Sequence, residues 1–181
     1  MGFPLPILRD GDLTVRPLTR SDEPAWLALR RANADWLRPW EATTPPGVGQ
    51  PSVTFAAFAR QERRAWKKGQ AFAGVIVVDD EIVGRVSIGG IRWGAERGGS
   101  LGYWIGEDHA GRGLTTRAVK LLIDYGFAQG LHRIEIAVQP HNEASLGVVA
   151  KLGFRSEGLR QSYLFIDGGW RDHLVFARTV D

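Results

Sequence analysis

Cysteine is absent from the 181-residue chain, which excludes disulfides and thiolate metal sites. Long apolar runs are missing too, since a stretch such as Ala71–Val78 is far shorter than the ~20 residues that a membrane-spanning helix needs. The N-terminal segment has no basic start, and Pro4 and Pro6 interrupt its apolar run, so it makes a poor signal peptide. A myristoylation signal would need Ser or Thr where Pro6 stands. We therefore expect a cytoplasmic protein with no membrane partner.

Strong charge of either sign is also lacking. The formal net charge is only +3, although the pI is about 9.6. A nucleic-acid-binding protein would usually gather its basic residues on one face, whereas the clusters here are small, and Arg60–Lys68 falls in a helical pattern typical of a solvated face. We therefore expect no direct contact with nucleic acid. The four histidines share no metal-ligand spacing on a helix, so we read them as surface or hydrogen-bonded residues and expect no metal: His109, His132, His141 and His173.

The composition that remains is that of an ordinary globular protein, with 44% hydrophobic and 24% charged residues. The length suits one domain, so we expect a single domain over residues 1–181. Alternating apolar residues and turn residues predict about seven strands. Five of them are Leu13–Pro17, Ala71–Val78, Ile82–Ile91, Ser100–Ile105 and Ile134–Val138, and two more lie in the tail on either side of residues 167–169.

Helical spacing and capping residues predict four helices. They run from Thr19–Asp22 to before Asp35, from a cap at Ser52 to Gly69, from Leu114 to Gly130, and from Asn142 to Leu152. The segment Trp36–Pro51, rich in Trp, Pro and Gly, is predicted to be a long loop of the kind that often carries function. The order β-α-α-β-β-β-α-β-α-β-β predicts a mixed α/β fold, with helices flanking a central, mostly antiparallel sheet. Its strand–helix–strand unit favours a locally parallel pair.

The segment from Gly102 to Ala118 is the first motif with chemical content. A strand leads into a glycine-containing loop, and the loop opens a helix. The first N–H groups of a helix have no intrahelical partner, and together with the helix dipole they form a site for anions. Gly111 and Gly113 would let a pyrophosphate approach the backbone closely. Hydroxyl donors or positive charge could come from Thr115, Thr116, Arg112 and Arg117.

Two common nucleotide motifs are excluded for this loop. The pattern GxxxxGK[ST] is absent, so it is not a P-loop. GxGxxG is absent as well, and the segment does not open a βαβ unit near the N-terminus. By itself the loop is equally consistent with a plain helix start, and a second motif is needed to decide.

That second motif runs from Ala137 to Phe154 and reads AVQPHNEASLGVVAKLGF. The combination of GYWIxxxxxGRG with VxPxNxxSxxVxxKLGF, at this separation, resembles the signature of the GCN5-related N-acetyltransferase (GNAT) superfamily. Within it, the chain is similar to the branch that acetylates the N-termini of ribosomal proteins. The resemblance covers most of the chain, including the LRPWE loop and the terminal WRDHLVFAR strand.

The resemblance implies the GNAT fold and acetyl-coenzyme A as co-substrate. In the family, the strand before the loop pairs with the pantetheine arm, and Tyr103, Trp104 and Ile105 hold those positions here. The helix-start asparagine, Asn142, would bond the pantetheine region. The phosphates would lie on the loop backbone, formed by Gly111, Arg112, Gly113, Leu114, Thr115 and Thr116. The family's loop usually begins with Gln or Arg and ends with Gly or Ala, places that Ala110 and Thr115 occupy in this chain.

The resemblance also suggests which groups move protons. Many family members use a tyrosine seven residues after the asparagine, where this chain has Val149. The branch it resembles uses a serine three residues after the asparagine, so Ser145 is the predicted donor to the leaving thiolate. Its alternative role is a backbone hydrogen bond within its helix.

The general base is less well specified by the sequence. Some relatives carry a carboxylate on the penultimate strand where this chain has Leu164. Glu41, in the Trp-Pro loop, is the leading candidate, and a solvated loop carboxylate is the alternative reading. Glu107 and Tyr163 are reserves. Substrate contacts are predicted for Trp40, Glu41 and Tyr163.

The acceptor is a primary amine, which must be neutral to attack a thioester. An α-amino group has a pKa near 8, so a useful fraction is free at neutral pH. We therefore expect a peptide or protein N-terminus, of a ribosomal protein or a similar peptide, as the partner of a monomer or homodimer. A small amine (an aminoglycoside, a polyamine or an amino acid) and a non-catalytic acyl-coenzyme A sensor are the alternatives. Longer acyl groups such as succinyl also stay open.

Overall fold

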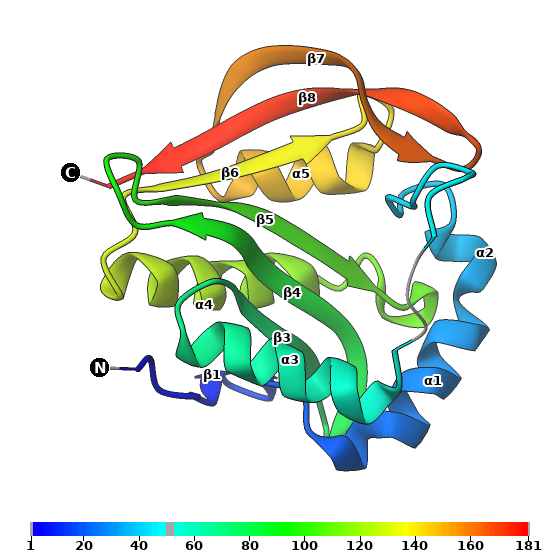
Figure 1. Cartoon of the computed structure of the whole chain (residues 1–181), viewed down its shortest axis with the longest axis vertical. Helices are drawn as coiled ribbons and strands as arrows, with labels where there is room; N and C mark the ends of the chain where they lie inside the picture. Colours follow the sequence, from blue (N-terminus) through cyan, green and yellow to red (C-terminus); the bar gives the residue numbers. More distant parts are fainter. Residues whose placement is uncertain (1, 50–52, 181) are drawn as a thin grey trace.

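The structure, a computed structural model, describes residues 2–49 and 53–180. Within them, eight strands form one sheet in the order β1-β2-β3-β4-β5-β6-β8-β7 (Figure 1). All neighbouring pairs are antiparallel except β5 and β6. The strands are β1 (Leu8–Asp10), β2 (Leu13–Arg16), β3 (Phe72–Val78), β4 (Glu81–Arg92), β5 (Gly98–Ile105), β6 (Arg133–Val138), β7 (Arg155–Ile166) and β8 (Gly169–Thr179). The predicted mixed α/β fold with a mostly antiparallel sheet is confirmed.

The helices fill the connections between these strands. They are α1 (Glu23–Ala32), α2 (Ala34–Leu37), α3 (Phe55–Lys67), α4 (Leu114–Ala128) and α5 (Glu143–Lys151), with short 3₁₀ turns η1 (Arg20–Asp22) and η2 (Glu107–His109). Among the described residues, none of these helices has both the length and the apolar character required to cross a membrane.

Three local predictions differ from the structure. The prediction of about seven strands missed β1, which has only three residues and so shows no readable alternation. The predicted loop from Trp36 begins too early, because α2 extends to Leu37. The predicted cap Ser52 lies outside the described residues, and α3 is instead capped by Thr54, whose hydroxyl accepts from the Ala57 N–H at 3.3 Å.

Two apolar clusters hold the sheet between its helices. All seven residues of β3 are buried, because helices cover both faces of that strand. On one face Ile76 packs in the cluster that contains α4, and on the other Val75 and Val77 pack with residues of α3. Trp66 of α3 also donates its indole N–H to the Tyr125 hydroxyl of α4, at 3.1 Å. The sheet is thus packed against helices on both faces.

The parallel contact between β5 and β6 is short. It consists of three residue pairs, from Gly98 with Arg133 to Ser100 with Glu135. Beyond Ser100, β5 remains paired with β4 and β6 remains paired with β8, while the two strands diverge (Figure 1). One edge of β5, over residues 101–105, therefore has no strand beside it. The predicted parallel pair is present, and its early end opens the sheet.

Gly84 of β4 is a position where the sheet leaves no room for a side chain. A Cβ there would press on the carbonyl oxygen of Trp104 and lie 3.0 Å from the Ile105 Cα. We predict that Gly84→Ala lowers the free energy of unfolding by about 1–3 kcal/mol, as overpacking does elsewhere.

Urea denaturation would measure this change. Gly89→Ala is the matched control on the same strand, since no atom lies within 4 Å of a Cβ added there. Equal stability of the two variants would contradict the described register of β4 and β5.

Candidate active site

A cleft of about 800 Å³ lies where β5 and β6 diverge. Its walls come from β5, the loop and first turn of α4, the end of β6, the start of α5, and β7 and β8. Trp36 and Leu37 of α2, together with Trp40, form a further part of the rim. Segments distant in sequence therefore meet around one opening in the sheet.

The free edge of β5 forms one wall of this cleft. Tyr103, Trp104 and Ile105, the predicted pantetheine-binding residues, all line it. The Ile105 carbonyl accepts a hydrogen bond from the Trp36 indole at 3.1 Å, which fixes α2 at the end of the strand. On the same strand, the Trp104 ring carries the Arg30 guanidinium at 5.1 Å from its centroid. Because β5 is fixed by its pairing with β4 and by the contact at Ile105, its open edge has a defined position in the cleft.

The loop before α4 supplies the second wall. Gly111 and Gly113 have φ of +73° and +75°, left-handed values that residues with a Cβ adopt only with strain. Gly113 is the N-cap of α4 and offers no side-chain cap, so the first N–H groups of this 15-residue helix have no side-chain acceptor at the cap. The space beside both glycines is open, since an added Cβ would meet no atom within 4 Å. These features fit a bound pyrophosphate.

Only some of the side chains in and after this loop face the cleft. Leu114, Thr115 and Thr116 line the cleft, as predicted, but Arg112 does not. Arg117 was expected to add positive charge here. It instead pairs with Asp10 at 2.9 Å and Asp12 at 2.8 Å, in the β1–β2 hairpin. The backbone amides and the helix dipole, and not Arg117, are therefore what this wall offers to an anion.

The start of α5 supplies the third wall. Asn142 caps the helix, its side-chain oxygen accepting from the Ser145 N–H at 3.0 Å. Ser145 lines the cleft. In the described part of the chain its hydroxyl makes no hydrogen bond, so it is not occupied by helix backbone. Burial raises the pKa of the Tyr103 hydroxyl, which points to the Ser145 carbonyl at 3.5 Å.

Glu41, the predicted base, is not placed in the cleft. Both its carboxylate oxygens accept from the Arg30 guanidinium, at 2.8 and 2.6 Å, and it is absent from the lining residues. Its neighbour Trp40 does line the cleft, and its ring contacts that of His141 at a tilt of 44°, with centroids 5.5 Å apart. Of the reserves, Tyr163 lines the cleft and Glu107 does not. The structure thus brings Trp40 and Tyr163 together with the predicted cofactor residues but leaves Glu41 outside.

His173 is the residue that the sequence interpretation missed. It was read as a surface or hydrogen-bonded residue. The hydrogen bond is present, between Nδ1 and the Arg171 carbonyl, but the side chain is only 3% exposed and forms part of the cleft wall. It occupies the same face of β8 as Val175 and Ala177, both buried. That period-two pattern was visible in the sequence, and it marked position 173 as inward-facing.

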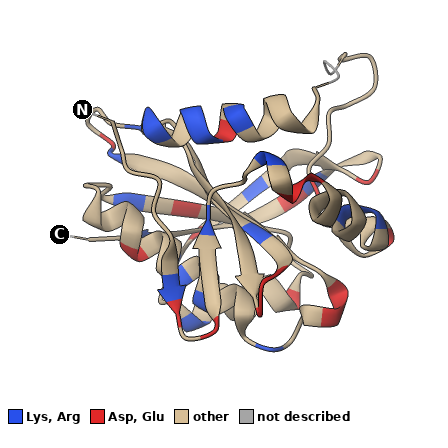
Figure 2. Cartoon of the chain, turned by 90° about the horizontal axis from the view of Figure 1, so that it is seen from below, with Lys and Arg blue, Asp and Glu red and all other residues tan. Residues whose placement is uncertain are grey.

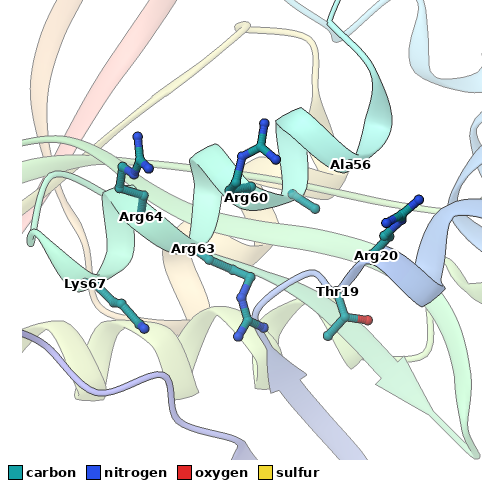
Figure 3. A pocket seen from close by; sticks show the side chains of 8 residues that line it. Thr19, Arg20, Ala56, Arg60, Arg63, Arg64 and Lys67 are labelled. Carbon is teal, nitrogen blue, oxygen red and sulfur yellow. The ribbon is translucent and has the colours of Figure 1, made fainter.

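A second hollow, of about 460 Å³, lies on the outer side of α3 and is unrelated to the cleft (Figure 3). Figure 2, in which Lys and Arg positions are blue on the ribbon, shows several basic positions spread along this helix. In Figure 3, Arg60 and Arg64 point to one side of α3 while Arg63 and Lys67 point to the other. These cations do not converge on one point, so they form no defined ligand pocket. In the residues that the structure describes, no group of three or more His, Asp or Glu is arranged to hold a metal.

Comparison with known proteins agrees with this geometry. A family model described as the acetyltransferase (GNAT) domain matches residues 12–155. The "Probable N-acetyltransferase YjcK" of Bacillus subtilis is 32% identical over 94% of this chain and 96% of its own length. The alanine N-acetyltransferase of ribosomal protein uS5 from Escherichia coli is 36% identical, over 82% of this chain and 77% of its own. The chain therefore belongs to the GNAT family of acetyltransferases.

A solved structure gives the same result in three dimensions. Mycobacterium smegmatis RimJ, in complex with CoA-disulfide, is 36% identical and superposes with a TM-score of 0.86, covering 96% of this chain and 86% of its own. These comparisons confirm the resemblance to the GNAT superfamily and to its ribosomal-protein branch. They also confirm the predicted enzyme class, an N-acetyltransferase.

Proposed function

We propose that this protein transfers the acetyl group of acetyl-coenzyme A to the N-terminal amine of a protein, with a ribosomal protein as the first candidate. The observation that carries the proposal is the meeting, in one cleft, of an unpaired strand edge and an uncapped helix N-terminus. The strand edge can pair with an extended chain that carries amides, and the helix N-terminus can bind a diphosphate. The pantetheine arm and the diphosphate of acetyl-coenzyme A have these properties.

Binding of the co-substrate follows from the chain's own groups. The amides of residues 111–116 would receive the diphosphate, and the free edge of β5 would pair with the pantetheine amides. Gly111 and Gly113 permit close approach because they carry no side chain and adopt left-handed φ. The related M. smegmatis RimJ, solved in complex with CoA-disulfide, supports coenzyme A as the ligand class.

Ser145 is well placed to protonate the leaving sulfur. It stands in the first turn of α5, its backbone N–H is held by Asn142, and its hydroxyl is free to donate into the cleft. The Tyr103 hydroxyl faces the Ser145 carbonyl and not its side chain, so it does not compete for that role. We propose that Ser145 donates the proton that the leaving thiolate takes up.

The charges in the cleft favour a peptide acceptor over a polyamine. A polyamine site needs carboxylates that are free to bind several ammonium groups. Glu135 is already paired with Arg133 at 2.7 Å and with Arg160 at 3.6 Å. Glu143 and Lys151 add one charge of each sign to the lining. The uS5 alanine acetyltransferase supports the same acceptor class, since its name records an α-amino substrate.

A thiol-release assay with acetyl-coenzyme A tests the acceptor. We expect release with peptides copied from ribosomal-protein N-termini, and mass spectrometry should place the acetyl group on the α-amine. The same peptides with a blocked N-terminus are the matched control and should give none. Turnover confined to polyamines, aminoglycosides or free amino acids would contradict the peptide assignment, and binding without any turnover would support a sensor.

Replacement of Ser145 tests its role as the proton donor to the leaving thiolate. We expect Ser145→Ala to lower kcat about 10²-fold, the lower end of the usual contribution of a proton-transfer group. The KM for acetyl-coenzyme A should be unchanged, because the backbone groups of residue 145 remain. Ser156→Ala, an exposed serine on β7, is the control. An unaltered kcat for Ser145→Ala would refute the assignment.

A further inference from the structure

His173 stands apart from the other buried polar side chains of the described residues. Asp22 is bound by Arg16 at 2.8 Å, Asn33 accepts from the Glu107 N–H at 2.7 Å, and Gln139 donates to the Pro39 carbonyl at 2.7 Å. Each of these ties two segments together. His173 has one ring nitrogen bonded within its own strand, and its ring lies in the cleft wall.

The hydrogen bond of His173 fixes its tautomer. Nδ1 lies 2.9 Å from the Arg171 carbonyl oxygen. A carbonyl oxygen only accepts, so Nδ1 must carry the proton and Nε2 must carry the lone pair. Across the described ranges, no side chain donates a hydrogen bond to that Nε2. Burial lowers the pKa of His173 below its ordinary 6.5, so the ring is neutral at neutral pH.

A bulge in β7 lies opposite the His173 ring. Arg160 pairs with His173 and Leu164 pairs with Arg171, so residues 161–163 face the single residue Asp172. Ser162 adopts φ +46°, an uncommon value for a residue with a Cβ, and its N–H donates to the Asp172 carboxylate at 2.7 Å. This bulge brings the Tyr163 ring to 5.7 Å from the imidazole, edge-on at 78°.

Three other candidate bases, Tyr163, Glu135 and Glu41, are already engaged by arginines. The Tyr163 hydroxyl accepts from Arg160 at 3.2 Å, and the same guanidinium lies over the Tyr163 ring. Glu135 accepts from Arg133 at 2.7 Å and forms an ion pair with Arg160 at 3.6 Å, and Glu41 is held by Arg30 outside the cleft. The position at which some relatives carry a carboxylate is Leu164.

We propose that His173 is the general base of the acetyl transfer, accepting the amine proton at Nε2. The inference rests on the proposed function and adds the group that the sequence did not identify. As the amine nitrogen forms its bond to the acyl carbon, the carbon–sulfur bond breaks. His173 takes the proton that the nitrogen loses, directly or through one water, and Ser145 gives its hydroxyl proton to the sulfur. The imidazolium then returns a proton through solvent to the serine oxygen, leaving an amide and a thiol.

The pH profile of kcat/KM tests this role. As the pH is lowered, the wild-type kcat/KM should fall first near pH 8, where the α-amine of the acceptor becomes protonated. It should fall again below pH 6.5, where His173 becomes protonated. Arg160, Tyr163 and Asp172 near the ring, and Glu135 further along the cleft wall, remain in the variant, so a lower limb caused by any of them would persist in it. His173→Gln should lower kcat/KM about 10²–10⁴-fold, retain the limb near pH 8, and lose the lower one.

Two comparisons make this result specific. His132→Gln removes an exposed imidazole outside the cleft and should keep both limbs. Calorimetry with coenzyme A shows whether His173→Gln still folds and binds. A His173→Gln variant with wild-type rate and both limbs would overturn the assignment. A wild type without turnover on any amine would instead refute the proposed function.

Nitrogen NMR of the wild type provides a readout that needs no activity. Near neutral pH the His173 Nε2 should show the chemical shift of an unprotonated nitrogen, and that shift should move when an acceptor peptide is added beside bound coenzyme A. Protonation at Nε2, or a shift unaffected by the peptide, would overturn the proposal even if His173→Gln failed to fold.

Discussion

The early end of the parallel pairing between β5 and β6 is the constraint on which the rest of the site depends. Three residue pairs join the strands, and after Ser100 and Glu135 they follow different neighbours. A continuous ladder would have used the backbone groups of residues 101–105 for the sheet itself. Because the ladder stops, those groups face a cleft, and an extended ligand can take the place of the missing strand.

The crossover between the same two strands accounts for the second half of the site. A parallel pair requires a long connection, here α4 with its preceding loop. The helix must begin near the C-terminal end of β5, so its N-terminus lies beside the open strand edge. Glycines at 111 and 113 leave that N-terminus uncovered. One topological feature thus positions both the amide edge and the anion site, and the proposed proton-transfer residues come from α5 and β8 on the opposite wall.

Sequence reasoning succeeded where a pattern is local. Gly111 and Gly113 before an apolar helix, and Asn142 three residues before Ser145, depend on neighbours along the chain, and the structure has helix starts at both places. The longer strands were similarly readable from apolar, β-rich runs bounded by turn residues. The three-residue β1 was too short to show a pattern, and α2 was hidden in a segment whose Trp and Pro content favoured a loop.

The unexpected contacts around the site involve partners that a local sequence pattern does not show. Glu41 was read as a candidate base in a loop, whereas Arg30 of α1, eleven residues earlier in the chain, holds its carboxylate. Arg117 was assigned to the anion site, whereas its aspartates lie more than 100 residues earlier. His173 shows the converse case, since its significance depends on burial and on the bulge of β7, which only the fold creates.

Hydrogen–deuterium exchange with and without acetyl-coenzyme A tests the central claim most directly. The account predicts slower amide exchange in residues 101–105 and 111–116 when the ligand binds, with little change in the β1–β2 hairpin. If calorimetry showed tight binding while both segments exchanged at unchanged rates, the ligand would lie elsewhere, and the role given to the divergence of β5 and β6 would be wrong.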